Sequence, residues 1–327
     1  MLSPSPAIQS LFRPLKLAAF SVALAFATAT PAQTYPAKPI RLLVGFAAGA
    51  SVDLTGRYYA ERVGKRLAQT VLVENRPGAA AQIAMRQLVD AAPDGYTIMV
   101  MSAGTSIASA RINPPFDVRR DMRPVAALVA GPLVFYVHPS LPVKNLAEWI
   151  AYAKARPGQL NYTSAGIGSL QNLIFEFFNQ RTGIKVEQVP FKGANESVMA
   201  VVAGQVQIGM DTLAPIRGQA EAGKVRLIAL TSARSFQGVP GTVEAGLAGF
   251  DFTSWSGIGA PVATPRNLVD ALNSAFNAVS NDPESVAHFA KQNQYPISGT
   301  PEDYGRLLAS ETEIWSKLIR ALNIQFD

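Results

Sequence analysis

Apolar and polar residues follow two different periods along this chain of 327 residues. Short apolar runs such as Ile40–Phe46 predict buried strands. Segments such as Asp53–Leu67, in which apolar residues recur every three or four positions, predict amphipathic helices. Strands and helices alternate from residue 40 onward, which is typical of an α/β fold with largely parallel sheets.

The order of the predicted elements repeats once. The first half contains strands and helices at Ile40–Phe46, Asp53–Leu67, Val71–Asn75, Gln82–Ala91 and Tyr96–Met101. The second half contains them in the same order at Leu160–Ser164, Leu170–Arg181, Lys185–Val189, Glu196–Ala203 and Val206–Asp211. The repeat is one of element order rather than of residues, and it predicts two similarly folded α/β lobes.

Two apolar segments stand outside this repeat. Pro132–Ser140 predicts a crossover between the lobes, and Phe252–Pro265 predicts the return. We therefore expect residues 35–135 and 256–327 to form lobe 1 and residues 136–255 to form lobe 2. Two crossovers make a hinge, and ligands bind between α/β lobes at the carboxyl ends of the strands.

The loops after the first strand of each half contain mostly small residues. Ala47–Ser51 precedes one predicted helix and Ala165–Ser169 precedes the other, whose first turn Ser169 is expected to cap. That second helix has a buried stripe formed by Leu170, Leu173, Ile174, Phe177 and Phe178. Backbone N–H groups and the helix dipole favour an anion at such places. The two loops are therefore expected to provide a matched pair of backbone donors to one small anion.

The first 32 residues have the layout of a secretory signal peptide. Arg13 and Lys16 precede the apolar stretch Leu17–Thr30, and cleavage is expected after Ala32. The stretch is shorter than the roughly 20 residues of a membrane-spanning helix, so the mature protein is expected to be exported and soluble. The chain has no cysteine, which excludes a lipoprotein, a disulfide scaffold, thiol catalysis and thiolate metal sites.

Charge and motifs argue against several other functions. The net charge is +6, or +4 without Arg13 and Lys16, and basic residues do not cluster with aromatic ones, so no nucleic-acid partner is expected. Gly166 and Gly168 begin a dinucleotide-like pattern, but its third glycine is replaced by Gln171. No Gly-x-Ser-x-Gly motif or metal-ligand spacing occurs, and the two histidines are 150 positions apart. We expect no enzyme, no cofactor and no metal.

Several polar and aromatic residues have two possible roles. Asp53 is either a ligand-binding group or an ordinary first-turn acid, and Asp211 either contacts a ligand amine or water or caps the next helix. The remaining candidates are Arg76 and Lys192 as carboxylate partners or solvated cations, Ser102 and Thr105 as hydroxyl donors, and Trp255 as cleft wall or core.

The sequence also resembles a known family. The segments that carry the resemblance are YPAKPIRLLVGFAAGASVDLTGR, VLVENRPGAAAQIA, AAPDGYTIMV, YTSAGIGSLQNL, VPFKGANESV and GQVQIGMDTL. They are similar to the Bug family of extracytoplasmic solute receptors, which serve tripartite tricarboxylate transporters, and the similarity runs from Tyr35 to the end. It implies a type II periplasmic binding protein: two α/β lobes, two crossovers and an interlobe cleft that closes on a small carboxylated ligand.

The resemblance further implies a monomer that delivers its ligand to membrane subunits of the transporter. It also implies a set of ligand-binding residues, namely Phe46, Ala47, Gly49, Ser51, Asp53, Thr105, Ser164, Ala165, Gly166, Gly168 and Asp211. The first loop departs from the family pattern F-x-P-G-G, since Ala48 and Ala50 replace the proline and the second glycine. Methyl groups there predict a tighter or less polar pocket. The alternative function is a receptor that presents its ligand to a membrane signalling partner.

Overall fold

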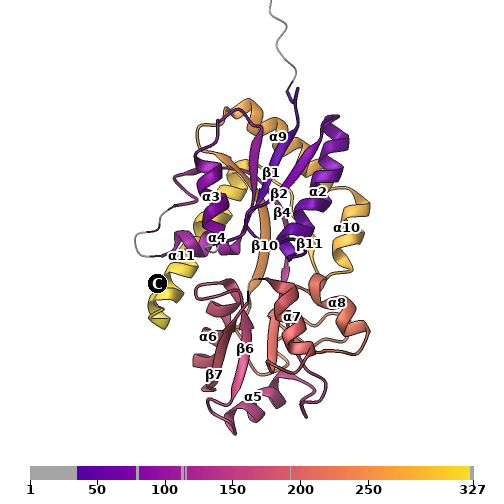
Figure 1. Cartoon of the computed structure of the whole chain (residues 1–327), viewed down its shortest axis with the longest axis vertical. Coiled ribbons are helices and arrows are strands. Elements are labelled where there is room, and N and C mark those ends of the chain that lie inside the picture. The colour runs from indigo at the N-terminus through magenta and orange to yellow at the C-terminus, as the bar shows by residue number, and fades with distance from the viewer. Residues whose placement is uncertain (1–34, 79–80, 112–113, 115, 192, 325–327) are drawn as a thin grey trace, which may run out of the picture. The chain divides into compact units, whose positions relative to one another are not determined.

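The computed structural model describes residues 35–78, 81–111, 114, 116–191 and 193–324. Residues 38–327 form a compact unit of their own, which contains all the elements shown in Figure 1. The expected signal peptide, residues 1–32, lies outside the described residues. Within the described part of the chain, no helix combines the length and the apolar character that crossing a membrane requires.

The strands form two sheets. The first sheet consists of β1 (Ile40–Val44), β2 (Val71–Asn75), β3 (Thr97–Ser102), β4 (Met122–Pro132), β10 (Thr253–Pro261) and β11 (Tyr295–Pro296). The second sheet consists of β5 (Val134–Val137), β6 (Leu160–Ser164), β7 (Val186–Pro190), β8 (Ile208–Asp211) and β9 (Arg226–Leu230).

The helices mostly alternate with the strands as the sequence predicts, although β5 directly follows β4, and β10 directly follows β9. They are α2 (Ser51–Leu67), α3 (Gln82–Val89), α4 (Ala103–Ser109), α5 (Leu146–Lys154), α6 (Leu170–Thr182), α7 (Ala194–Val202), α8 (Leu213–Glu221), α9 (Arg266–Ser280), α10 (Pro283–Ala290) and α11 (Pro301–Leu322). Ser169 caps α6 as expected, because its side chain accepts a hydrogen bond from the backbone N–H of Asn172 at 3.3 Å.

The expected repeat of element order is confirmed by the arrangement of the strands. The first sheet has the order β11-β4-β10-β3-β1-β2 and the second has the order β7-β6-β8-β5-β9. In the first sheet β1 pairs in parallel with β2 and β3, and in the second β6 pairs in parallel with β7 and β8. An antiparallel strand lies beside each parallel set, β10 in the first sheet and β5 in the second. Each is the first strand that the chain forms after it passes over from the other sheet.

The chain passes between the sheets twice, at the two expected segments. It leaves the first sheet after Pro132 and enters the second at Val134, and it returns between Leu230 and Thr253. Leu133 separates β4 from β5, and it exchanges hydrogen bonds with Thr231. The N–H of Leu133 donates to the Thr231 hydroxyl, and the carbonyl of Leu133 accepts from the Thr231 N–H. The domain boundaries at 135–136 and 255–256 stay predictions.

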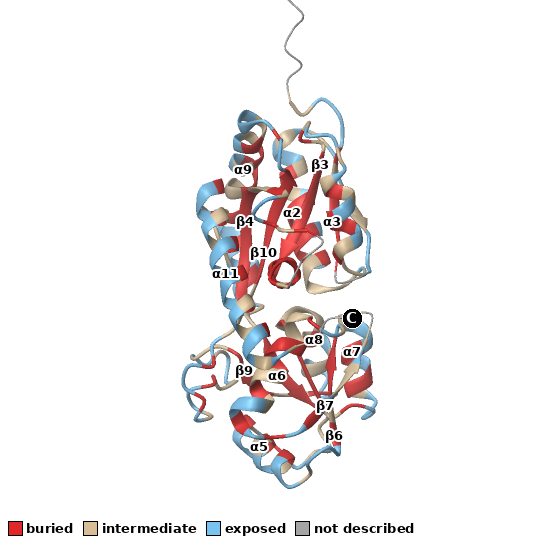
Figure 2. Cartoon of the chain, turned by 90° about the vertical axis from the view of Figure 1, so that its left-hand side faces the viewer, coloured by how far each residue is buried: buried red, intermediate tan, exposed pale blue. Residues whose placement is uncertain are grey.

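Apolar side chains pack against both sheets, and Figure 2 shows buried positions along the strands and exposed positions on the outer faces of the helices. One cluster lies against the first sheet and includes Leu43, Met99 and Tyr304. Another lies against the second sheet and includes Phe135 and Phe178.

Helix α11 contributes to both clusters. Its first half packs Tyr304 and Leu308 into the cluster of the first sheet, and its second half packs Trp315 and Ile319 into the cluster of the second. Between these positions, Oε2 of Glu311 accepts hydrogen bonds from the indole N–H groups of Trp255 at 3.1 Å and Trp315 at 3.0 Å. One carboxylate oxygen therefore links a tryptophan of each cluster.

The Glu311 carboxylate is expected to stabilise the fold. Glu311→Ala leaves the N–H groups of Trp255 and Trp315 without their acceptor, and both side chains are buried. We expect the free energy of unfolding to fall by about 2–6 kcal/mol in urea denaturation, since each of the two stranded donors costs on the order of 1–3 kcal/mol. Glu311→Gln, which keeps an acceptor oxygen, should lose less. Equal stability of Glu311→Ala and the wild type would contradict this role.

Candidate functional site

A cavity with a volume of about 110 Å³ lies between the two sheets, at the carboxyl ends of β1, β3, β6, β7 and β8. This is where the alternation of strands and helices predicts a ligand site. The cavity is lined by Phe46, Ala47, Ala50, Ser51, Val52, Ser102, Ala103, Gly104, Leu133, Ala165, Gly168, Ser169, Leu170, Gln171, Gly193, Ala194, Asp211 and Ser254.

Three helices begin at the wall of this cavity. Their N-cap and first residues line it: Ala50, Ser51 and Val52 of α2, Ser169, Leu170 and Gln171 of α6, and Gly193 and Ala194 of α7. The start of the short helix α4 lines it too. Helix α2 follows a strand of the first sheet, whereas α6 and α7 follow strands of the second. Both halves of the molecule therefore place helix N-termini at the same cavity.

The first-turn N–H groups of these helices are available to a ligand. An α-helix leaves its first N–H groups without an intrahelical acceptor. Among the described residues, no acceptor is bound to the N–H groups of Ser51, Val52, Leu170, Gln171 or Ala194. The helix dipoles add partial positive charge at the same ends, so the cavity favours an anion.

The glycine N–H groups, by contrast, are occupied within their own loops. The N–H of Gly49 donates to Oδ2 of Asp53 at 2.8 Å, that of Gly166 donates to the Ser164 hydroxyl at 3.0 Å, and that of Gly168 donates to Oδ1 of Asn172 at 2.9 Å. All three glycines have positive φ, at 83°, 103° and 75°. Within the two expected donor loops, these three N–H groups are therefore already bonded, and the glycines turn the chain so that the helix starts face the cavity.

Asp53 holds the first loop rather than lining the cavity. Its side chain is 1% exposed and accepts hydrogen bonds from Gly49, from Nε of Arg57 at 3.0 Å and from Nδ2 of Asn75 at 2.8 Å. Nδ2 of Asn75 also donates to the carbonyl of Phe46 at 3.0 Å. Burial raises the pKa of Asp53, but the hydrogen bonds from Arg57, Gly49 and Asn75 outweigh it and the net shift is downward. The Asp53 carboxylate thus holds the first loop in place through these hydrogen bonds.

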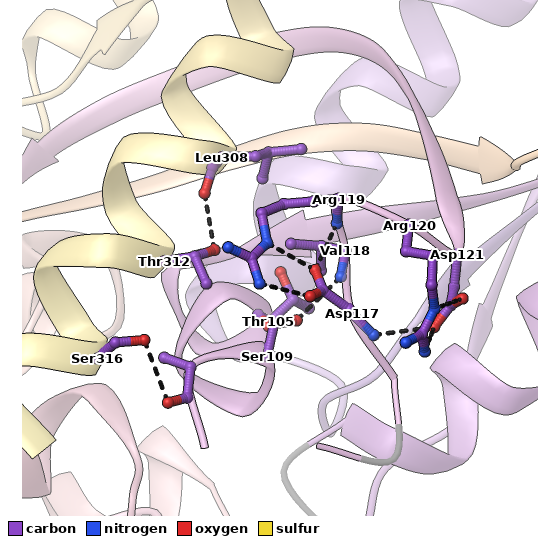
Figure 3. A network of polar contacts seen from close by, with 11 residues as sticks. Thr105, Ser109, Asp117, Val118, Arg119, Arg120, Asp121, Leu308, Thr312 and Ser316 are labelled. Atoms are coloured by element: carbon purple, nitrogen blue, oxygen red, sulfur yellow. Dashed lines mark hydrogen bonds and ion pairs between the residues drawn. The ribbon is translucent and has the colours of Figure 1, made fainter. Parts of the chain in front are cut away.

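Thr105 is buried inside the turn that starts α4. Its hydroxyl donates to the carbonyl of Ser102 at 2.5 Å, and its own carbonyl accepts from the Ser109 hydroxyl at 3.0 Å. That hydroxyl in turn accepts from the N–H of Val118 at 3.0 Å, in the network of Figure 3. Ser102, the other hydroxyl considered for this strand end, lines the cavity instead.

The predicted site residues thus divide into two groups. Those that line the cavity are Phe46, Ala47, Ser51, Ala165, Gly168 and Asp211, and those that do not are Gly49, Asp53, Thr105, Ser164 and Gly166. The sequence prediction missed most of the first-turn residues, namely Ala50, Val52, Ala103, Gly104, Ser169, Leu170, Gln171, Gly193 and Ala194, together with Leu133 and Ser254. The start of each predicted helix was the signal that could have identified them. Ligand contact by any of these residues stays a prediction.

The other candidates take ordinary structural roles where the structure describes them. Arg76 is half-exposed and pairs with Glu74 at 3.0 Å. Trp255 is buried in the core. Lys192 lies outside the described residues. No group of acidic or histidine side chains that could hold a metal ion occurs in the described part of the chain.

Asp211 is the charged residue among those that line the cavity. Its side chain is 8% exposed, and its Oδ1 accepts hydrogen bonds from the N–H of Thr212 at 2.7 Å and the Thr212 hydroxyl at 3.4 Å. Burial raises the pKa of Asp211 to about 6, against opposing hydrogen bonds from Thr212 and Gln171. The cavity thus combines helix starts, apolar walls and one buried carboxyl group.

The two halves of the molecule approach each other closely beside the cavity. A Cβ atom placed on Gly49 would lie 2.7 Å from Nδ2 of Asn195, and one placed on Gly193 would lie 3.6 Å from the Cβ of Ala47. Gly49 and Ala47 follow β1 of the first sheet, whereas Gly193 and Asn195 begin α7 of the second. The glycines allow this close approach.

Comparison with known proteins gives consistent matches over most of the chain. Residues 55–324 match the family model described as tripartite tricarboxylate transporter family receptor. The chain is 32% identical to a UPF0065 protein of Bordetella bronchiseptica, over 97% of this chain and 95% of that protein. It is 31% identical to BugT of Bordetella pertussis, over 92% and 94%.

Two solved structures have the same fold and bound ligands. R. palustris Rpa4515 with adipate is similar with a TM-score of 0.85 and 29% identity, covering 89% of this chain and 99% of that chain. MatC from Rhodopseudomonas palustris with bound malate is similar with a TM-score of 0.81 and 26% identity, covering 87% and 100%.

The buried carboxyl group of Asp211 is expected to cost stability at neutral pH. Its pKa is about 6 in the folded protein against an ordinary 3.8, so the folded state binds this proton more tightly than the unfolded chain does. Asp211→Asn should therefore raise the free energy of unfolding, by up to about 3 kcal/mol above pH 6. The gain should disappear as the pH falls through 3.8. Urea denaturation between about pH 3 and 8 measures this gain. No gain at neutral pH would contradict the cost.

Proposed function

We propose a function from the premise that the chain belongs to the tripartite tricarboxylate transporter receptor family. This membership confirms the resemblance to the Bug receptors and the fold of a type II periplasmic binding protein with two α/β lobes. It also makes the chain a solute receptor rather than an enzyme. Its ligand and its partners are the subject of the proposal.

The chain is proposed to capture a small carboxylated organic anion in the cavity between the two sheets. The observation that carries this proposal is the convergence of three helix starts with open N–H groups on one small cavity. The ligands of the two structural neighbours, adipate and malate, are organic acids and support the same ligand class.

The helix starts can bind a carboxylate without a cationic side chain. Each carboxylate oxygen accepts two or more hydrogen bonds, and those from ordered N–H groups to an ionised acceptor are stronger than bonds between neutral groups. The donors are fixed by their helices, so little ordering is needed on binding. The apolar side chains of Phe46, Leu133 and Leu170 provide contacts for the body of the ligand.

A ligand at this place would also link the two halves of the molecule. Ser51 begins α2, which follows β1 of the first sheet, whereas Leu170 and Ala194 begin helices that follow β6 and β7 of the second sheet. A carboxylate that accepts hydrogen bonds from both sides binds only when the walls are close, so it favours the closed arrangement by differential affinity.

The cellular setting follows the family. We propose that residues 1–32 act as a signal peptide that is cleaved after Ala32, and that the receptor works as a periplasmic monomer. It would then present the closed, loaded cavity to membrane subunits of a tripartite transporter. These steps rest on the layout of the leader sequence and on family membership.

Removal of one helix-start donor tests the ligand site. Ala194→Pro deletes the first N–H of α7, and Gly193 before it is extended at φ −174° and ψ 171°, as a residue before proline must be. Proline already occupies this helix position in α10 and α11. We expect the affinity for the carboxylate that gives the largest thermal shift to fall about 10- to 100-fold in calorimetry, the effect of losing one charge-assisted hydrogen bond.

The matched control for this variant is Arg266→Pro. Arg266 is the first residue of α9 and does not line the cavity, and its ion pairs with Asp270 and Glu302 are exposed and contribute little. Its affinity should equal that of the wild type. An Ala194→Pro variant that folds, by circular dichroism, and binds as tightly as the wild type would overturn the site.

The transport role has a cellular test. A strain that lacks this chain should lose uptake of the labelled carboxylate that the purified protein binds, and the wild-type gene should restore it. Ala194→Pro should restore uptake only at higher ligand concentrations, because its affinity is lower. Normal uptake together with a lost transcriptional response to the ligand would instead favour the receptor that presents its ligand to a signalling partner.

A further inference from the structure

The two buried aspartates of the ligand region differ in their partners. Asp53 forms an ion pair with Arg57, whose Nε lies 3.0 Å from Oδ2. Asp211 forms no ion pair with any described residue, and its hydrogen-bond partners are Thr212 and Gln171, both neutral. Asp211 lines the cavity and Asp53 does not. The carboxylate without a counter-charge is therefore the one that a ligand can reach.

A buried carboxylate without a counter-charge is costly to the fold. The two bonds from Thr212 both end on Oδ1, and burial raises the pKa of Asp211 to about 6. Replacing such a group with a neutral one of the same shape would relieve this cost. A carboxylate at this position is explained if the ligand brings the missing positive charge.

The lining of the cavity therefore contains groups of both positive and negative character. The starts of α2, α6 and α7 offer N–H donors and partial positive charge, and Asp211 at the end of β8 offers negative charge. The lining also includes the apolar side chains of Phe46, Leu133 and Leu170. Among the described lining residues no lysine or arginine is present to receive a second ligand carboxylate.

We propose that Asp211 selects the ligand class: the cavity binds an aminocarboxylate, whose carboxylate accepts from the helix starts while its ammonium group donates to Asp211. This inference rests on the proposed function, because it uses the same cavity and the same carboxylate site. A dicarboxylate of the same length places a second anion beside Asp211, where like charges repel in a medium that screens them poorly. The receptor should therefore reject it.

Matched ligands test this selection on the wild-type protein. The pairs are 4-aminobutanoate with glutarate and 6-aminohexanoate with pimelate, in which a carboxylate replaces the ammonium group on an unchanged chain. L-Leucine paired with isobutylmalonate places the same change next to the carboxylate. Binding is measured by calorimetry at about pH 7.5. In the pair whose chain length fits the cavity, the amino compound is expected to bind at least about tenfold more tightly than the dicarboxylate. This is the effect of one buried pair of opposite charges in place of a pair of like charges.

Substitution of the carboxyl group tests the residue. Asp211→Asn keeps the shape and an acceptor for Thr212 but removes the charge, so the preference for the amino compound should shrink at least about tenfold, the value of one charge-assisted contact. Glu187→Gln is the matched control, because it removes an exposed carboxylate from β7 in the same sheet. Its preference should equal that of the wild type.

The possible results separate the two proposals. Tighter binding of the dicarboxylate in every pair, or an unchanged preference in Asp211→Asn, overturns the selection by Asp211 and leaves the carboxylate receptor standing. Binding of none of the carboxylates, while a ligand without a carboxylate raises the melting temperature, overturns the carboxylate receptor and the selection together. Both proposals are supported if the wild type binds an amino compound tightly and if this binding is weaker in Asp211→Asn and in Ala194→Pro.

Discussion

The structure depends on a property of every α-helix, the unpaired N–H groups of its first turn. Parallel strands bring the starts of their following helices to one edge of a sheet, and two sheets with the same strand order face these edges toward one cavity. The repeat of α/β elements thus creates the anion site as well as the fold. The loops need only small residues and a few glycines to let the helix starts approach each other.

This arrangement explains why the polar side chains near the site serve the backbone. Asp53 and Asn75 fix the loop before α2, while Ser164 and Asn172 fix the loop before α6. Each side chain occupies a loop N–H or carbonyl group and leaves the helix N–H groups open. A receptor of this kind can change its ligand by changing the side chains that line the cavity with the helix starts, and in this chain Asp211 is one of them.

Much of the architecture could be predicted from the sequence because it follows local periodicity. Both crossovers and the cap at Ser169 were predicted, as were the bounds of β2 and β6. Strand β4 was missed apart from its end, and its break at Leu133 depends on a hydrogen-bond partner 98 positions away. The site was predicted only in part, because sequence identifies the loops but not which of their N–H groups are already bonded. Gly49 and Thr105, whose N–H and hydroxyl groups bond within their own turns, do not line the cavity.

The most direct measurement of the central claim is an amide chemical-shift titration of the ¹⁵N-labelled protein with the aminocarboxylate that binds most tightly. Hydrogen bonds from N–H groups to a carboxylate move the proton resonances of the donors downfield. The account predicts the largest downfield shifts at Ser51, Val52, Leu170, Gln171 and Ala194, with small shifts at Gly49, Gly166 and Gly168. Large downfield shifts at the three glycines, with the helix-start amides unmoved, would contradict it.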